Sequence, residues 1–173
     1  SIDEDWHNGS GSAKLLWRPL DDRGLEVFGG VAQGFRAPNL SDLSRLDTAR
    51  SGELETAAPG LDPEKFLNSE IGLRVTGDRY HAGLAYYYTD IEEMIVRAPT
   101  GRVIDGAFEV TKRNASSGFI HGFELDGDLK LCDTVTLFGS FSWMDGEVDG
   151  FPTSGPESVR EPVSRLLPPA GLL

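Results

Sequence analysis

The sequence predicts an all-β fold, an antiparallel up-and-down transmembrane β-barrel segment of about six strands. Three observations lead to this prediction. Apolar residues recur with the period of two that strands require, and the links between the periodic runs are short and long in alternation. The runs also approach or exceed the roughly 9 to 11 residues that a tilted strand needs to cross a bilayer.

The most regular pair of strands covers residues 68–76 and 80–88. Each run places apolar or aromatic side chains on one face and mostly polar or small side chains on the other. Gly77-Asp78 joins the runs, and a two-residue link that contains glycine predicts a tight hairpin. This link places Leu73 opposite Ala82, so that apolar residues meet apolar residues across the pair.

A second hairpin is predicted from residues 119–131 and 135–143, which alternate in the same way. A two-residue link would mix the apolar and polar faces of this pair. A three-residue turn at Cys132-Asp133-Thr134 keeps them separate and places Leu129 opposite Leu137. We therefore predict the three-residue turn.

A third hairpin is predicted from residues 13–18 and 25–36, around a turn from Asp21 to Gly24. Gly29-Gly30 and a run of mixed polarity interrupt the alternation there. The sequence therefore leaves open which face of this hairpin is apolar.

The remaining links are long and cover roughly residues 38–65, 90–116 and 146–163. Structureless loops of this length are uncommon in compact soluble domains. Short turns at one end and long loops at the other are typical of outer-membrane barrels. A soluble β-sandwich explains the alternation equally well, but it explains the asymmetry of the links less well.

The two faces of the predicted strands suit a membrane wall. The polar face carries charges that would be costly against lipid and that fit a wet or plugged lumen. Aromatic residues lie near the long-loop ends of their strands, where an aromatic girdle would sit. The charged residues are Glu70, Arg74, Glu124, Asp126, Asp128 and Lys130, and the aromatic residues are Tyr86, Tyr88 and Trp143.

Composition excludes several classes of protein. The net charge of −12 argues against binding to nucleic acid, which needs a surplus of Lys and Arg. The single cysteine, Cys132, cannot form an internal disulfide. No run approaches the ~20 apolar residues of a membrane helix. The chain starts at Ser1 without Met and stops at Leu173, so we expect a fragment of a longer protein.

A motif follows at the end of the predicted strand 25–36. It consists of Gly34, Phe35, Arg36, Ala37, Pro38, Asn39 and Leu40. Two further segments follow in order: one contains Pro63, Glu64, Glu70 and Gly72, and the other contains Gly122 and Glu124 after His121. Arg165 with Pro168-Pro169 forms a looser fourth segment. Pro38 cannot donate to a strand ladder and restricts its predecessor, which suits the exit of a strand from a sheet.

These ordered segments resemble the barrel of TonB-dependent receptors, in which the GFRAPNL segment leads a strand out of the membrane into an extracellular loop. The resemblance spans about residues 34–169 of the chain. It implies short periplasmic turns, long extracellular loops and a place in the bacterial outer membrane, in contact with its lipid. Residues 1–173 would then be a partial barrel domain, without the plug domain and the remaining strands.

The resemblance implies that the parent receptor binds a scarce nutrient, such as a ferric siderophore or a vitamin, and imports it with energy from the TonB complex, which acts through the absent plug. Ligand contacts are expected within 41–65, 90–116 and 146–163, while Arg36 and Asn39 are interpreted as residues that fix the strand exit and the loop. The alternatives are a secreted β-sandwich for binding or adhesion and a passive porin. The ligand itself cannot be inferred.

No catalytic, cofactor or metal site is expected. The histidines His7, His81 and His121 are scattered and lack metal-ligand spacing. No nucleophile elbow or catalytic triad emerges from the sequence. Asp145, Glu147 and Asp149 lack the length and order of an EF-hand loop, so a solvated loop is the simpler interpretation. The protein is therefore not expected to be an enzyme.

Overall fold

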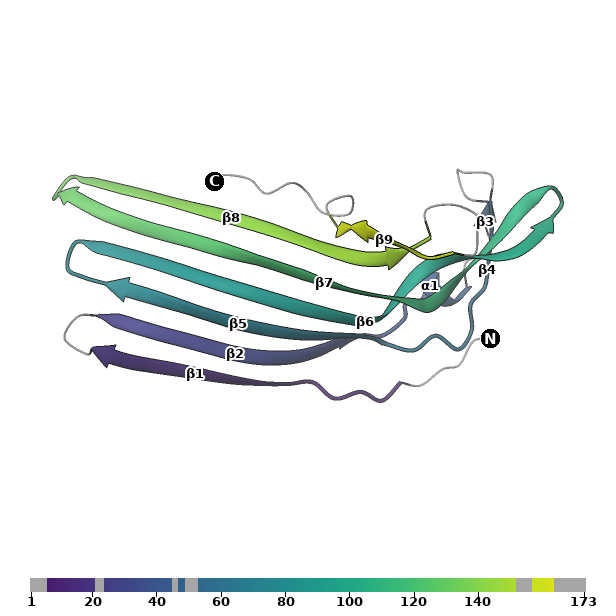
Figure 1. Ribbon diagram of the computed structural model, residues 1–173, viewed down its shortest axis with the longest axis horizontal. Coiled ribbons are helices and arrows are strands. Elements are labelled where there is room, and N and C mark those ends of the chain that lie inside the picture. The colour runs from purple at the N-terminus through teal and green to yellow at the C-terminus, as the bar shows by residue number, and fades with distance from the viewer. Residues whose placement is uncertain (1–5, 21–23, 45–46, 49–52, 152–156, 164–173) are drawn as a thin grey trace.

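The computed structural model describes residues 6–20, 24–44, 47–48, 53–151 and 157–163. Within these residues all strands belong to one nine-stranded sheet, accompanied by one short helix (Figure 1). The elements are β1 (Gly11–Leu20), β2 (Leu25–Arg36), α1 (Leu40–Ser44), β3 (Asp47–Thr48), β4 (Leu54–Thr56), β5 (Glu64–Thr76), β6 (Tyr80–Ile104), β7 (Ala107–Cys132), β8 (Val135–Gly150) and β9 (Val159–Pro162).

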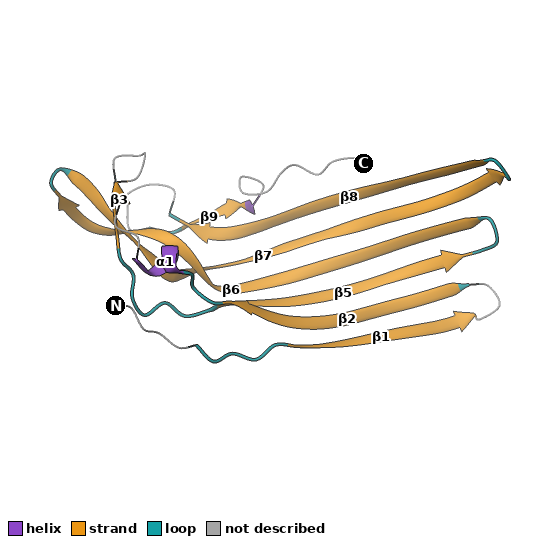
Figure 2. Ribbon diagram, turned by 180° about the vertical axis from the view of Figure 1, so that it is seen from behind, coloured by secondary structure: helices purple, strands orange, loops and turns teal. Residues whose placement is uncertain are grey.

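Six long strands, β1, β2, β5, β6, β7 and β8, lie side by side and pair antiparallel in that order. The links β1–β2, β5–β6 and β7–β8 share one end of the sheet, here named the turn end. The opposite end, named the loop end, carries α1, β3, β4 and β9 (Figure 1 and Figure 2). The up-and-down wall with one-sided loops is thus confirmed, and the about six predicted strands are joined by three short ones.

The register aligns apolar residues into rows that run across all six long strands. One row contains Trp17, Val27, Leu73, Leu84, Leu125 and Phe141, each paired with the next. We name this side of the sheet the apolar face. Residues of the opposite parity, such as Glu26, Arg74, Asp126 and Ser140, form the polar face. This separation is what a wall between lipid and water requires.

The hairpin between β5 and β6 differs from its prediction by two residues. Thr76 pairs with His81 instead of Arg79, and Leu73 meets Leu84 instead of Ala82. The N–H of Gly77 donates to the carbonyl of Tyr80 at 2.8 Å, so the turn closes around Asp78-Arg79 and not at Gly77-Asp78. Because strand faces alternate with period two, a shift of two residues keeps every side chain on its predicted face.

The hairpin between β7 and β8 has the predicted register but not the predicted turn. Leu129 pairs with Leu137 as expected. However, Cys132 pairs with Val135, so the turn contains two residues, and Leu131 is an extra residue next to the ladder. A two-residue turn with a bulge gives the same offset as the predicted three-residue turn, which explains why the register alone could not distinguish them.

The structure also shows which side of the hairpin between β1 and β2 is apolar, a question that the sequence left open. Leu15 pairs with Gly29 and Trp17 with Val27, which puts these residues on the apolar face. Gly24 has a φ of 60°, a value that glycine tolerates. The rest of the predicted turn, Asp21 to Arg23, lies outside the described residues.

The prediction of a long loop over 90–116 is wrong. Strands β6 and β7 continue through this range to Ile104 and Ala107. Asp105 and Gly106 link them with φ values of 50° and 85°. Two successive positive φ values in an Asp-Gly pair are typical of a type I′ hairpin turn. The two strands therefore form a hairpin that extends beyond the neighbouring strands at the loop end (Figure 1).

The other two long links contain structure as well. Between 38 and 65 the chain forms α1, β3 and β4, and β4 pairs with β7 in the parallel direction. Between 146 and 163, β8 continues to Gly150 and then pairs with β9. These links remain the long connections of the fold, but they are not structureless loops.

The sheet has little interior of its own. Among the described residues, no large side chain is completely buried, and apolar side chains such as Leu15 and Phe138 are 73% and 87% exposed. A β-sandwich would pack a second sheet against one of these faces, and the described strands form one sheet only. The described residues therefore do not form a β-sandwich. In the described part of the chain, no helix is long and apolar enough to span a membrane.

Candidate functional site

The first motif places a buried ion-pair network at the loop end. Arg36 ends β2 and pairs across the ladder with Glu64, the first residue of β5. Two nitrogens of the Arg36 guanidinium donate to both carboxylate oxygens of Glu64, at 2.5 and 2.7 Å. Glu64 is 5% exposed and also accepts the N–H of Ile95 at 2.9 Å. A bidentate pair of this kind fixes the geometry of both partners.

The same arginine reaches the short helix that follows the motif. Its Nη1 donates to Asp42 at 3.0 Å, and Lys112 of β7 donates to the other oxygen of Asp42 at 2.7 Å. Burial of Asp42 opposes ionisation, but the hydrogen bonds from Lys112, from the Asn39 backbone and from Arg36 outweigh it and lower the pKa of Asp42. The ionised Asp42 side chain of α1 therefore connects this helix to β2 through Arg36 and to β7 through Lys112.

Asn39 and Asp42 also cap the helix reciprocally. The N–H of Asp42 donates to the Asn39 side chain at 2.9 Å, and the N–H of Asn39 donates to the Asp42 side chain at 3.1 Å. This is the arrangement of a capping box. The remaining motif residues Gly34 and Phe35 lie in β2, Ala37 and Pro38 link the strand to Asn39, and Leu40 begins the helix.

The later motif residues lie on the polar face, away from this network. Glu70 and Gly122 both pair with Tyr87, and Gly72 and Glu124 both pair with Ala85. The fold therefore brings two segments that are 50 residues apart into adjacent rows of β5, β6 and β7. Pro63 precedes β5 and is buried next to Glu64.

Both motif glycines on the polar face lie beneath an aromatic side chain. A Cβ at Gly72 would come within 2.3 Å of the Phe28 ring, and a Cβ at Gly122 within 2.7 Å of the Tyr87 hydroxyl. The guanidinium of Arg74 lies 5.7 Å from the centre of the Phe28 ring. The glycines are thus needed for the close approach of these rings to the backbone.

The links 38–65 and 90–116 interlock at the loop end. Besides the Asp42–Lys112 pair and the β4–β7 ladder, Asn114 of β7 holds the first link through its side chain. Its amide oxygen accepts the N–H of Asp62 at 2.8 Å, and its nitrogen donates to the carbonyls of Asp62 and Glu93 at 2.8 and 2.7 Å. The amide thus satisfies both backbone groups of Asp62, as a neighbouring strand would.

Ion pairs and a small apolar cluster complete the contact between these links. Arg97 of β6 pairs with Glu53 at 2.8 Å and with Glu55 at 3.7 Å. The apolar cluster consists of the buried residues Leu43, Ala58 and Leu61, with Trp6 and Ile95 packed against them. The two links therefore form one packed unit, which we name the loop clasp and define as the described residues 39–44, 47–48 and 53–64 together with 93–114.

A cavity of about 360 Å³ opens on the loop clasp, between residues 57–61 and residues 111–114. It is lined by Lys112, Arg113 and Asn114 from β7 and, among others, by Ala58 and Leu61, which are buried. The cavity lies where two of the three predicted ligand-contact regions meet. The third region, 146–163, is described only in part.

The histidines stay apart in the fold. His81 lies on the polar face, 3.3 Å from Asp126 and 3.8 Å from Asp128. His121 lies on the apolar face, where its Nδ1 and the Tyr86 hydroxyl are 3.1 Å apart. Over the described residues, no group of three or more His, Cys, Asp or Glu side chains could hold a metal ion.

His121 is part of an aromatic cluster on β6, β7 and β8 that the sequence showed only in part. The predicted girdle residues Tyr86, Tyr88 and Trp143 belong to it. Tyr88 stacks on Phe119 with ring centres 5.7 Å apart, and Trp143 stacks on Phe123 at 5.6 Å. The whole cluster consists of Tyr86, Tyr88, Phe119, His121, Phe123, Phe141 and Trp143.

Comparison with known proteins shows which family has this architecture. The family model of the TonB dependent receptor-like β-barrel matches residues 1–168. The chain belongs to this family. The fourth motif segment, Arg165 with Pro168-Pro169, lies outside the described residues.

Individual members of the TonB-dependent receptor family have low sequence identity to this chain. The iron-regulated outer membrane virulence protein of Vibrio cholerae is 28% identical over 130 residues, 70% of this chain and 20% of that protein. The vitamin B12 transporter BtuB of Vibrio vulnificus is 30% identical over 102 residues, 59% of this chain and 15% of that protein. The chain thus spans about a fifth or less of the length of these relatives.

Solved receptor structures share the fold. The siderophore receptor PirA from Pseudomonas aeruginosa superimposes with a TM-score of 0.63 at 24% identity, over 82% of this chain and 30% of that structure. The ferric enterobactin receptor PfeA of the same organism gives 0.65 at 20% identity, over 84% of this chain and 26% of that structure. In all these structures the match is to part of a larger barrel, which agrees with the open sheet seen here.

Proposed function

We propose that the parent protein of this chain is a receptor that captures a scarce nutrient, such as a ferric siderophore or a vitamin, in its extracellular loops and imports it through its barrel. Membership of the TonB-dependent receptor family is the observation that carries the proposal. The same membership locates the chain in the bacterial outer membrane. Relatives named as siderophore, vitamin B12 and iron proteins support the class of ligand.

Energy for import would come from the TonB complex, which would act through a plug domain in another part of the polypeptide. The polar face supports this assignment, because its charged and hydrogen-bonding side chains suit a lumen that is wet or filled by a plug. The motif residues Glu70, Gly72, Gly122 and Glu124 would then belong to the lumen wall. The apolar face, with its aromatic cluster as a girdle, would contact outer-membrane lipid.

The loop clasp would form part of the ligand-capturing surface. Its buried ion pairs hold two long links in one arrangement before a ligand arrives, and preorganisation of this kind reduces the entropic cost of binding. In this proposal Arg36, Asn39 and Asp42 fix the clasp, whereas ligand contacts come from side chains around its cavity. Transport of this kind requires no chemical conversion of the ligand by the chain.

Uptake by the full-length receptor tests the proposal. A strain that lacks the gene is complemented with it, and uptake of radiolabelled ferric siderophores and vitamin B12 is measured in cells with and without functional TonB. We expect uptake of one ligand class to depend on both the receptor and TonB. Receptor-dependent uptake that persists without TonB would instead favour the passive porin, and the absence of any receptor-dependent uptake would contradict the proposal.

A further inference from the structure

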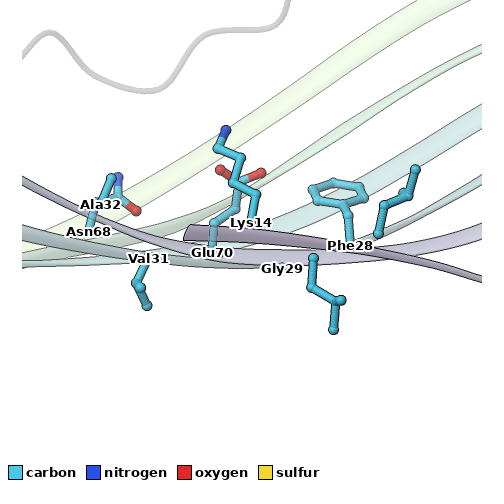
Figure 3. Close-up of a pocket in the computed structure, with 10 residues that line it drawn as sticks. Lys14, Phe28, Gly29, Val31, Ala32, Asn68 and Glu70 are labelled. Atoms are coloured by element: carbon cyan, nitrogen blue, oxygen red, sulfur yellow. The ribbon is translucent and has the colours of Figure 1, made fainter. Parts of the chain in front are cut away.

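Two adjacent glycines in β2, Gly29 and Gly30, leave the wall without a side chain on either face at this place. On the polar face, a cavity of about 350 Å³ lies beside Gly30 and is lined by Lys14, Phe28 and Glu70 (Figure 3). On the apolar face, a depression of about 580 Å³ lies over Gly29. Figure 3 shows Val31 pointing to the opposite side of the sheet from Lys14, Phe28 and Glu70.

The depression on the apolar face is open and is bordered by exposed apolar side chains, and we name it the Gly29 pit. Leu15 and Ile71 pair with Gly29 from the two neighbouring strands, and Val31 lies two residues further along β2. Leu15, Ile71 and Val31 are 73%, 62% and 49% exposed, so they stand out from the sheet around a floor that has no side chain. Trp17, which is 60% exposed, borders the pit toward the turn end.

The depth of the pit in the membrane limits what can fill it. Gly29 lies four residues from Leu25, the first residue of β2, and four residues from Gln33, where a polar side chain returns to the apolar face. Since about 9 to 11 residues cross the bilayer, Gly29 lies near its middle. Headgroups and sugars stay at the membrane surface, and only hydrocarbon reaches this depth.

We infer that the Gly29 pit holds the terminal part of a lipid acyl chain. An empty hollow would deprive its apolar walls of dispersion contacts, which a flexible hydrocarbon chain can supply. The pit is continuous with the apolar face that contacts lipid, and its walls expose apolar side chains. A lipid chain bound there is more ordered than the chains that face the rest of the wall.

Trp17 makes this inference testable in the full-length receptor. The protein is reconstituted in phosphatidylcholine vesicles that contain lipids brominated near the chain end or near the headgroup, and bromine quenches indole fluorescence on contact. The contribution of Trp17 is the difference between the wild type and Trp17→Phe. Trp143, in the same row as Gly29 but on β8, serves as an internal control through Trp143→Phe.

Quenching of Trp17 by chain-end bromine is expected to exceed quenching by headgroup-proximal bromine, and Gly29→Leu is expected to lower it by about half by filling the pit. Quenching of Trp143 should stay unchanged. Gly139→Leu is the matched control, because Gly139 lies on the apolar face of β8 and no atom lies within 4 Å of an added Cβ.

Unchanged quenching of Trp17 in Gly29→Leu would overturn the inference, as would weak quenching at every depth, which would indicate that a protein partner covers the pit. A Cβ at Gly29 would lie 3.2 Å from the Glu70 carbonyl oxygen, so Gly29→Leu could disturb the strand. Ser69→Leu fills the pit from its rim, where a Cβ already exists, and should lower quenching in the same way. The outcome is independent of what the receptor transports.

Discussion

Removal of Arg36 is expected to loosen the loop clasp. Arg36→Ala leaves Glu64 and Asp42, which are 5% and 6% exposed, without a guanidinium partner. Breaking a buried ion pair from one side costs about 3 to 5 kcal/mol, because the other charge stays buried and unpaired. Arg36 itself is 41% exposed, and Lys112 still pairs with Asp42, so we reduce this cost to about 2 kcal/mol.

Hydrogen exchange in the full-length receptor measures this change at two reporter amides. The N–H of Leu43 donates to Asn39 and the N–H of Ala58 donates to Leu43, so both amides open when the clasp opens. A loss of about 2 kcal/mol accelerates their exchange about 30-fold. Arg36→Lys keeps the positive charge but loses the contact of two guanidinium nitrogens with Glu64, so it should give a smaller acceleration of exchange.

The control is Arg18→Ala, which removes an ion pair with Glu26 near the turn end. Arg18 is 58% exposed, and an exposed pair contributes at most about 1 kcal/mol, so exchange in the clasp should stay unchanged. Exchange at Leu43 and Ala58 within about threefold of the wild type in Arg36→Ala would refute the reasoning, because it would mean that the buried carboxylates do not depend on Arg36.

Three further predictions concern the same fold. Because the folded-state pKa of Asp42 is lowered, its carboxylate stabilises the clasp above the unfolded pKa of about 3.9, and this stabilisation is lost as the pH falls through the folded value. The protection factors of the clasp amides, which correct for the slower intrinsic exchange in acid, should therefore fall at low pH, and less so in Asp42→Asn. Gly72→Ala should lower the thermal unfolding temperature of the barrel through an overpacking cost of about 1 to 3 kcal/mol, whereas Gly139→Ala should not. Asn114→Ala removes three hydrogen bonds and should speed proteolysis of the clasp, with a cost of about 2 to 3 kcal/mol; unchanged cleavage would show that water replaces the amide.

The wall of the fold could be predicted from the sequence because its signals are local. Alternation placed Leu73, Leu125 and Phe141 on one face, and the structure confirms this. The register of β5 with β6 could not be fixed, because pairings that differ by two residues present the same faces. The backbone hydrogen bond at Gly77 decides between them.

The outer part of β6 and β7 was missed although a local signal existed. Asp105-Gly106 lies between the apolar pairs Val103-Ile104 and Ala107-Phe108, and an Asp-Gly pair in this setting is a strong hairpin signal. The bulges near Met94 interrupt the period of two, which hid the continuity of the strands.

The loop clasp could be predicted only in part. The motif pointed to Arg36 and Asn39, but their partners Glu64 and Asp42 follow from the fold alone, and so does Lys112, which is 70 residues from Asp42. Parallel pairing of β4 with β7 requires the chain to cross β5 and β6. No periodic pattern in three residues can indicate such a crossing.

The interlocking of the two links has a consequence for how such receptors diversify. A substitution of Asp42 leaves the half-buried Lys112 ammonium without its carboxylate partner, and a change at Asn114 releases the backbone at Asp62. The two segments therefore cannot acquire new sequences one at a time without loss of order. Among related barrels, positions 42 and 112 should change together, and transfer of a new specificity should require both segments to be exchanged as one cassette.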